Sequence, residues 1–168
     1  MEHGRAGEFD EFVAARWSAL VHLARLLVGG DRHRAEDLLQ ESLVKLWFVW
    51  PRVAEDAPES YVRKVMARAA ARSSRRRWWG ERPVEQLPEV AAARDVSADV
   101  AERSRLETAL AQLSPKQRAA VVLRYYQDLP EGQVAEALGC PVGTARSHAA
   151  RGVAQLRQLL ADVIEPAR

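Results

Sequence analysis

The sequence of 168 residues contains one cysteine, Cys140. A single thiol excludes an intramolecular disulfide, so the chain fits a reducing cytoplasm, with Cys140 as a small buried hydrophobe. Long apolar runs are missing as well. None approaches the roughly 20 residues of a membrane span, and the opening MEHGRAGEFDEF is charged where a signal peptide would be apolar. We therefore expect a cytoplasmic protein without a membrane segment.

The sequence also lacks the motifs of catalysis and metal binding. It has no phosphate-binding glycine loop, no nucleophile elbow and no metal-ligand pair. Its histidines lie too far apart in the chain to suggest a local metal site: His3, His22, His33 and His148. We expect no enzyme activity, no metal and no cofactor.

The sequence has almost no excess of charge of either sign, with a formal net charge of +2 at pH 7. A nucleic-acid surface would therefore depend on charge segregation. Segregation occurs in residues 61–82, where Glu81 is the only acid among eight basic residues: Arg63, Lys64, Arg68, Arg72, Arg75, Arg76, Arg77 and Arg82. Together with Trp78 and Trp79, this run could combine phosphate neutralisation with base stacking, as binding of opened DNA requires. The alternative is a solubilising helix end with its tryptophans in the core.

Hydrophobic residues make up 48% of the chain and recur at helical spacing, which predicts an all-α fold. The first helix is expected over residues 8–28, with Trp17 on its apolar stripe and Gly29-Gly30 ending it. Asp31 is a suitable N-cap for a second helix that runs to Trp50, before Pro51. Ala57-Pro58 begins a third helix, which carries the basic run.

We divide the chain into a first helical domain over residues 1–82, a flexible linker over 83–103 and a second helical domain over 104–168. The linker region has prolines, scattered acids and no sustained apolar face. In the second domain, Ser114 is expected to cap a helix that has Pro115 at its first position.

The stretch from Leu129 to Leu160 predicts two helices joined by a tight turn. Pro130 suits the first turn of one helix, and Gly139 suits its left-handed cap. The next helix begins near Val142, with Val142 on its apolar stripe. A small residue at Ala135 would allow the two helices to cross closely. This is the pattern of a helix-turn-helix that places a recognition helix in the major groove.

The polar face of that recognition helix would provide the contacts to DNA: Thr144, Arg146, Ser147, His148 and Arg151. Arginine can pair with guanine edges or phosphates, and serine and threonine suit either. The alternative is an ordinary helical hairpin with a solvated cationic face.

Three segments together resemble the extracytoplasmic-function (group IV) sigma factors of the sigma-70 superfamily, in particular small actinobacterial-type members. They are AEDLLQE, SYVRKVMARAAARSSRRRWW, and LSPKQRAAVVLRYYQDLPEGQVAEALGCPVGTARSHAARGVAQLR. The resemblance covers most of the chain, about residues 8–79 and 106–160. In the last segment PKQR, LRYY, the ALG turn and VGTARS fall in the order expected of sigma domain 4.

The resemblance implies a protein that binds core RNA polymerase, through the β′ clamp and the β flap, and directs it to promoter DNA. It nominates Asp37, Gln40 and Glu41 for the polymerase, although periodicity alone also allows a solvated helix face there. It assigns reading of the −35 element to the recognition-helix residues named above. It assigns recognition and melting of the −10 element to Arg68, Arg72, Arg75, Arg76, Arg77, Trp78 and Trp79. An anti-sigma factor is a further candidate partner.

Two other classes compete with this interpretation. One is a two-domain regulator whose DNA-binding hairpin is controlled by a ligand or phosphorylation domain, but the first half lacks the alternating strands of a receiver. Co-purification with core RNA polymerase separates that class from a sigma factor. The other is an enzyme acting on nucleic acid, which a nuclease assay tests.

The tryptophan pair generates a prediction about strand opening. Successive helical residues point about 100° apart, so Trp78 and Trp79 diverge and only one can meet unpaired bases. Loss of a stacking platform costs roughly 1–3 kcal/mol per base. One of the two Trp→Ala variants should therefore keep its thermal stability and duplex binding yet form open complexes poorly. A template with a mismatched −10 region should rescue that variant. Unfolding of both variants, or normal opening by both, would remove the tryptophans from this role.

Overall fold

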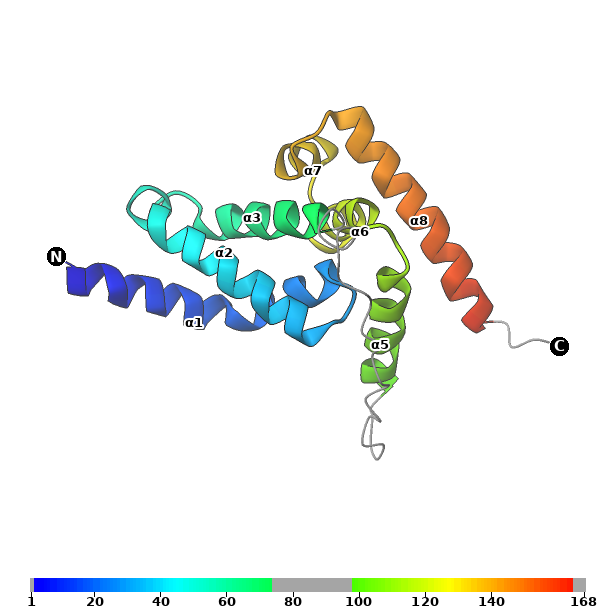
Figure 1. Ribbon diagram of the computed structural model, residues 1–168, viewed down its shortest axis with the longest axis horizontal. Helices are drawn as coiled ribbons and strands as arrows, with labels where there is room; N and C mark the ends of the chain where they lie inside the picture. The colour runs from blue at the N-terminus through cyan, green and yellow to red at the C-terminus, as the bar shows by residue number, and fades with distance from the viewer. Residues whose placement is uncertain (1, 74–97, 165–168) are drawn as a thin grey trace.

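The computed structural model describes residues 2–73 and 98–164, and this part of the chain is helical, without strands. The first half contains three helices that lie side by side (Figure 1). They are α1 (Glu2–Leu27), α2 (Arg32–Val53) and α3 (Pro58–Arg72). The predicted all-α fold is confirmed for the described residues.

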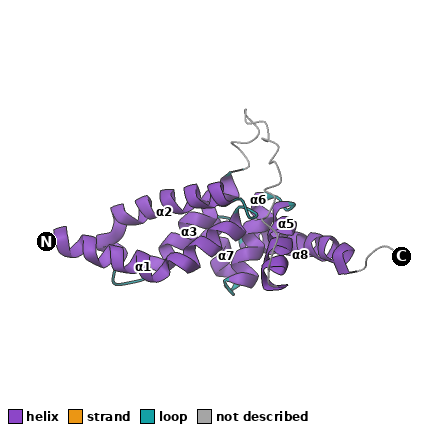
Figure 2. Ribbon diagram, turned by 90° about the horizontal axis from the view of Figure 1, so that it is seen from below, coloured by secondary structure: helices purple, strands orange, loops and turns teal. Residues whose placement is uncertain are grey.

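The second half continues the helical fold. It contains α5 (Ala98–Ala111), α6 (Pro115–Val121), the π-helical turn η1 (Val122–Tyr126), α7 (Glu131–Leu138) and α8 (Val142–Ile164). Helix α8 packs along α6 and also contacts α5 and α7. Helix α3 packs against α6 and α7, so the two halves are in direct contact (Figure 2).

Local capping explains where several helices begin. The Asp31 carboxylate accepts a hydrogen bond from the Arg34 N–H at 3.1 Å, at the start of α2. The Ser114 hydroxyl accepts one from the Gln117 N–H at 3.3 Å, at the start of α6. Such side chains satisfy N–H groups that have no partner within the helix. Both predicted caps are confirmed.

Glycines with a left-handed backbone follow two of the helices. Gly29 has φ 72° and Gly30 φ 88° after α1, where the pair was predicted to end the helix, and Gly139 has φ 67° after α7, where a left-handed cap was predicted. Gly29 is also required sterically, because a Cβ there would lie 2.7 Å from the Ala111 Cα. The turn after α1 therefore lies directly against α5 of the second half.

Helix α1 begins earlier than predicted and helix α2 ends later. One hydrogen bond joins the two additional segments. Helix α1 begins at Glu2, and α2 continues through Pro51 to Val53. Proline has no N–H, so the Trp47 carbonyl loses its partner within α2. The Arg5 guanidinium, in the unpredicted first turns of α1, donates to that carbonyl at 3.0 Å.

Other sequence expectations also need correction. Helix α5 begins at Ala98, so residues 98–103 of the predicted linker are helical. Trp17 is 48% exposed and Val142 is 43% exposed, although both were assigned to apolar stripes. Leu20, Leu23 and Leu27 provide the buried contact of α1 instead. Val142 is the first residue of α8, where no earlier turn of the helix covers it. The remainder of the predicted linker, 83–97, lies outside the described residues.

Two clusters of buried side chains hold the halves together. The larger includes Leu46 and Met66 of the first half and Leu110 and Val122 of the second. The smaller lies beneath the last two helices and includes Ala67 of α3. Since α3 contributes to both clusters, separating the halves would expose apolar surface on each.

One buried arginine ties the two halves through backbone carbonyls. The Arg118 side chain is 4% exposed, and its Nε donates to the Leu110 carbonyl at 2.8 Å. Its Nη2 donates to the Leu113 carbonyl at 3.0 Å, and its Nη1 to the Leu27 carbonyl at 3.3 Å. Leu27 ends α1, so this guanidinium joins the first half to α5 and α6.

Replacing Arg118 with methionine should therefore destabilise the fold. The substitution keeps much of the side-chain volume but removes the buried donors, and we expect a loss of about 3 kcal/mol in the free energy of unfolding. Urea denaturation followed by circular dichroism measures this loss. Arg157→Met, at an exposed position of α8, is the matched control and should change stability by less than about 0.5 kcal/mol. Equal losses in the two variants would contradict the role of Arg118.

Candidate nucleic-acid interface

Helices α7 and α8 form the predicted helix-turn-helix. The turn begins at Gly139, and α8 crosses α7 over small buried residues. Ala135 of α7 is 4% exposed, and Ala145 and Ala149 of α8 are 1% and 8% exposed. Small side chains allow two helix backbones to approach closely. Cys140 is half-buried beside this cluster, rather than fully buried as expected.

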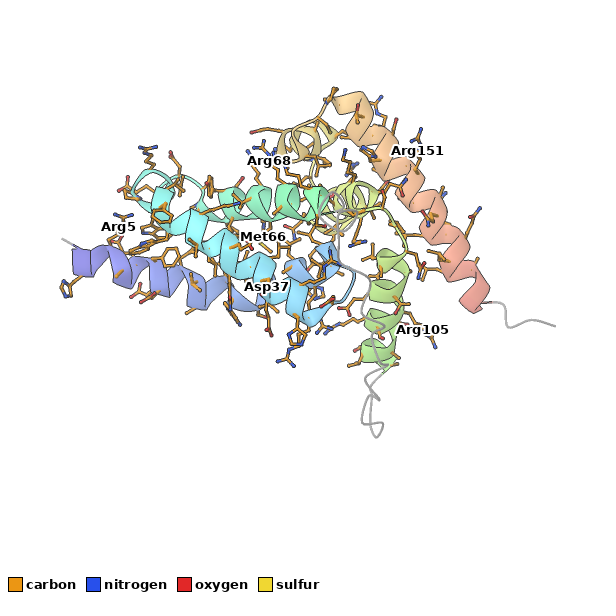
Figure 3. The ribbon with its side chains drawn as sticks, viewed as in Figure 1. Arg5, Asp37, Met66, Arg68, Arg105 and Arg151 are labelled. Atoms are coloured by element: carbon orange, nitrogen blue, oxygen red, sulfur yellow. The ribbon has the colours of Figure 1, made fainter. Side chains whose placement is uncertain are left out.

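The residues predicted to read the −35 element lie within the first ten residues of α8. Thr144, Arg146, Ser147 and Arg151 are exposed, and Figure 3 shows Arg151 on the outer side of the helix. His148 is half-buried. Burial, with Lys116 and Arg151 nearby, lowers the pKa of His148 from its ordinary 6.5. The ring is therefore neutral at neutral pH and offers one donor and one acceptor.

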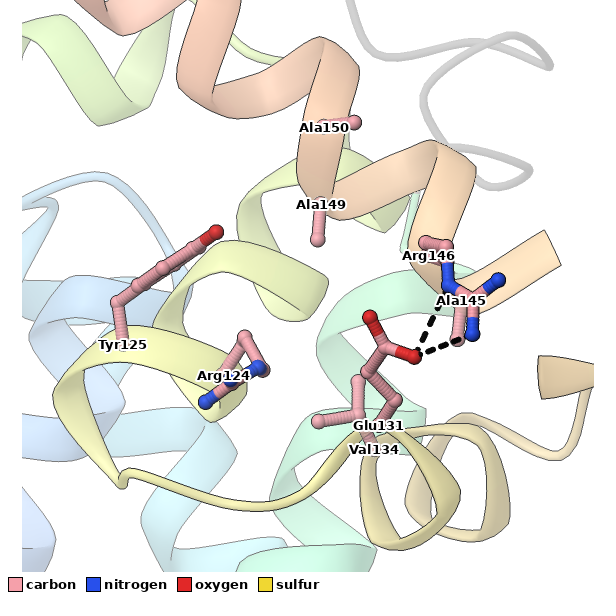
Figure 4. Close-up of a pocket in the computed structure, with 8 residues that line it drawn as sticks. All are labelled: Arg124, Tyr125, Glu131, Val134, Ala145, Arg146, Ala149 and Ala150. Carbon is pink, nitrogen blue, oxygen red and sulfur yellow. Dashed lines mark hydrogen bonds and ion pairs between the residues drawn. The ribbon is translucent and has the colours of Figure 1, made fainter. Parts of the chain in front are cut away.

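Arg146 is held by a carboxylate of the preceding helix. Its Nε and Nη2 donate to Glu131 Oε2 at 2.9 and 2.7 Å (Figure 4). The hydrogen bond and charge of Arg146 lower the pKa of Glu131, and those of Glu131 raise the pKa of Arg146. Sequence reasoning missed Glu131, because it is 15 positions from Arg146 and periodicity does not reveal such a pair.

The α3 residues predicted to act at the −10 element have different surroundings. Arg68 Nε donates to the Ala137 carbonyl at 2.8 Å, and its Nη2 donates to the Glu136 carbonyl at 2.7 Å. These carbonyls belong to the last turn of α7, and that of Glu136 also accepts the N–H of the cap residue Gly139 at 3.2 Å. Lys64 also contacts Glu136, with 2.6 Å between Nζ and Oε1. Figure 3 shows Arg68 between α3 and α7.

The other predicted −10 residues are not brought into this contact. Arg72 is exposed in the last turn of α3. The remaining five lie outside the described residues: Arg75, Arg76, Arg77, Trp78 and Trp79.

The residues predicted to contact polymerase form an exposed face of α2. Asp37, Gln40 and Glu41 are all exposed (Asp37 is labelled in Figure 3), and two large apolar side chains continue this face. Val44 is 55% exposed and Phe48 is 76% exposed, seven and eleven positions after Asp37. Sequence reasoning missed this apolar pair. The available signal was its i, i+4 spacing away from the core stripe.

Two features are absent from the described residues. No group of three or more histidine, cysteine, aspartate or glutamate side chains gathers there to hold a metal ion. No helix in that part of the chain is long and apolar enough to cross a membrane.

Comparison with known proteins identifies both halves. The family model of Sigma-70 region 2 matches residues 13–80, and that of Sigma-70, region 4, matches residues 103–156. The RNA polymerase sigma-E factor of Streptomyces avermitilis is 39% identical, over 95% of this chain and 89% of that protein. The ECF RNA polymerase sigma factor SigL of Mycobacterium tuberculosis is 31% identical, over 92% of this chain and 88% of that protein.

A solved structure has the same fold. It is the sigma factor RpoE from Bartonella quintana, in complex with the anti-sigma factor NepR. The TM-score is 0.64 at 22% identity, and the match covers 91% of this chain and 96% of that chain. With the two sigma regions in order and relatives more than 30% identical over most of their length, the chain belongs to the sigma-70 family of RNA polymerase sigma factors, in its extracytoplasmic-function group.

Proposed function

We propose that this protein binds core RNA polymerase and directs promoter-specific transcription initiation, reading the −35 and −10 elements and assisting strand opening. The observation that carries the proposal is the presence of Sigma-70 regions 2 and 4 in one chain, in which region 4 presents an exposed polar helix face. Residues 1–82 would bind polymerase and the −10 element, and residues 104–168 the −35 element, with 83–103 connecting them.

Reading of the −35 element is assigned to the exposed side of α8. Residues near the start of a recognition helix meet base edges in the major groove, and later residues meet the phosphates. Arg146 is the fifth residue of α8 and Arg151 the tenth. Arg146 is thus the base-reading candidate, and Arg151 the phosphate contact. Thr144, Ser147 and the neutral ring of His148 supply further donors and acceptors.

Binding of polymerase is assigned to the exposed face of α2. Asp37, Gln40 and Glu41 would supply polar contacts, and Val44 and Phe48 would add apolar area beside them. Exposed aromatic side chains are typical anchors of protein interfaces. A solvated helix face would not need an aromatic side chain that is 76% exposed at Phe48.

Recognition of the −10 element is assigned to α3 and to the basic, tryptophan-containing segment that follows it. Arg68 is exposed, but its Nε and Nη2 already donate to the α7 carbonyls, so these donors are not free for DNA in this arrangement. Engagement of these Arg68 donors with the −10 element would therefore require α3 and α7 to separate. The compact arrangement would be a form of the free protein, distinct from the form on the promoter.

We assign no catalytic step to the chain, because a sigma factor acts by binding. It would work in the cytoplasm, on RNA polymerase. An anti-sigma factor, such as the one in the Bartonella quintana complex, would be an additional partner.

In vitro transcription tests the proposed function directly. Core RNA polymerase with this protein should transcribe a defined subset of genomic fragments, and start-site mapping should reveal common elements near −35 and −10. Core polymerase alone should not select these sites. Failure of the protein to bind core polymerase, or initiation without sequence preference, would contradict the proposal.

The α2 face generates a prediction about polymerase affinity. Asp37→Arg with Glu41→Arg should weaken core binding and leave the fold intact, because interface charges alter association and its salt dependence. Fluorescence titration with core polymerase measures the affinity. The matched control is Glu8→Arg with Glu11→Arg, which reverses the same charges at exposed positions of α1. Unchanged core affinity in the α2 variant would remove this face from the interface.

The α8 face generates a prediction about sequence discrimination. Arg146→Ala should lose roughly 1–3 kcal/mol of discrimination at one position of the −35 element. Arg151→Ala should weaken binding to all sequences alike and reduce its salt dependence. Holoenzyme binding to promoters with single substitutions in the −35 element measures both effects. Equal losses for Arg146→Ala on cognate and scrambled −35 sequences would contradict base reading.

A further inference from the structure

We infer that Glu131 is a positioning residue for DNA recognition, which holds the Arg146 guanidinium in the orientation needed to read a guanine. This inference rests on the proposed role of Arg146 at the −35 element. Glu131 itself would not touch a base.

The geometry of the ion pair leaves one edge of the guanidinium free. An arginine side chain has five N–H donors in a planar fork. The carboxylate of Glu131 accepts from Nε and from one Nη2 hydrogen, at 2.9 and 2.7 Å. The adjacent end edge keeps two parallel donors, one on each Nη nitrogen. Paired donors of this kind match the O6 and N7 acceptors of guanine in the major groove.

The position of Glu131 in the fold makes it suitable for this role. It is the first residue of α7 and its side chain is 40% exposed, so part of the side chain is fixed against the protein. Together with Val134 and Ala145, it lines a small hollow between α7 and α8 (Figure 4). Arg146 rises from α8 beside this hollow, and its side chain is 64% exposed. One end of the ion pair is thus anchored, and the other faces solvent.

The stability of the fold does not account for the contact. Exposed ion pairs contribute little to stability. A carboxylate beside a DNA-binding arginine also opposes binding to phosphates, since it cancels charge. A fixed guanidinium plane would instead favour the one base whose acceptors it matches. We therefore expect Glu131 to increase discrimination between sequences rather than overall affinity.

The test uses holoenzyme and the promoter identified by start-site mapping. Binding is measured for templates that carry each base in turn at every −35 position, with wild-type protein, Glu131→Gln, Glu131→Ala and Arg146→Ala. A further variant, Arg146→Lys, keeps the charge but removes the planar fork. The control is Asp128→Asn, which removes an exposed carboxylate near α7 that contacts Arg124 rather than Arg146. Asp128 has φ 52°, a conformation that asparagine tolerates.

Wild-type protein should prefer guanine at one position, by about fivefold to 150-fold for a bidentate pair. Both Glu131 variants should lose at least about threefold of that preference, at the position where Arg146→Ala and Arg146→Lys lose it. Their melting temperatures and preferences at other positions should match those of Asp128→Asn.

Two results would overturn the inference while leaving the role of Arg146 intact. One is an undiminished preference for guanine in the Glu131 variants when Arg146→Ala has lost it. The other is tighter binding of the Glu131 variants to all templates alike, which would make Glu131 a competitor of the phosphates. If Arg146→Ala keeps the full preference for guanine, both the inference and the base-reading role of Arg146 are overturned. Transcription from the promoter by the wild-type protein is a separate result, which tests the proposed function.

Discussion

The architecture depends on the packing of α3, a helix of the first half, against α6 and α7 of the second half. Its buried face is rich in alanine, including Ala67, Ala70 and Ala71. Small residues allow α6 and α7 to approach this helix closely. Ala67 joins the cluster beneath the helix-turn-helix, whereas Ala70 and Ala71 belong to the larger core. One helix of region 2 thus helps to build the core of region 4.

The same packing links the fold to function. The basic side of α3 is turned toward the carbonyl end of α7, where Lys64 and Arg68 find acceptors within the protein. Under the proposed function, Arg68 would instead meet phosphates or bases on promoter DNA. The hydrogen bonds that Arg68 donates to α7 in the compact form would therefore be replaced by hydrogen bonds to DNA once α3 and α7 separate. Under the proposed function, packing on α7 and binding of the −10 element would thus compete for the same donors.

Local features of the structure could be predicted from the sequence, and distant contacts could not. The caps at Asp31 and Ser114 and the turn at Gly139 depend on a few neighbouring residues, and all three were predicted. The continuation of α2 through Pro51 depends on Arg5, 42 positions from the carbonyl that it satisfies. The exposed polar face of α8 could be predicted, because it follows from helical periodicity. Its link to Glu131 and the contact of Arg68 with the α7 carbonyls depend on how separate helices pack.

A distance measurement tests most directly whether the two regions pack together in the free protein and separate on the promoter. Spin labels would be placed at Arg52→Cys in α2 and Arg157→Cys in α8, both exposed, in a Cys140→Ser background. We expect one narrow distance distribution for the free protein and a different distribution in the promoter complex with core polymerase. A broad distribution in the free protein, or an unchanged distance on the promoter, would contradict this expectation.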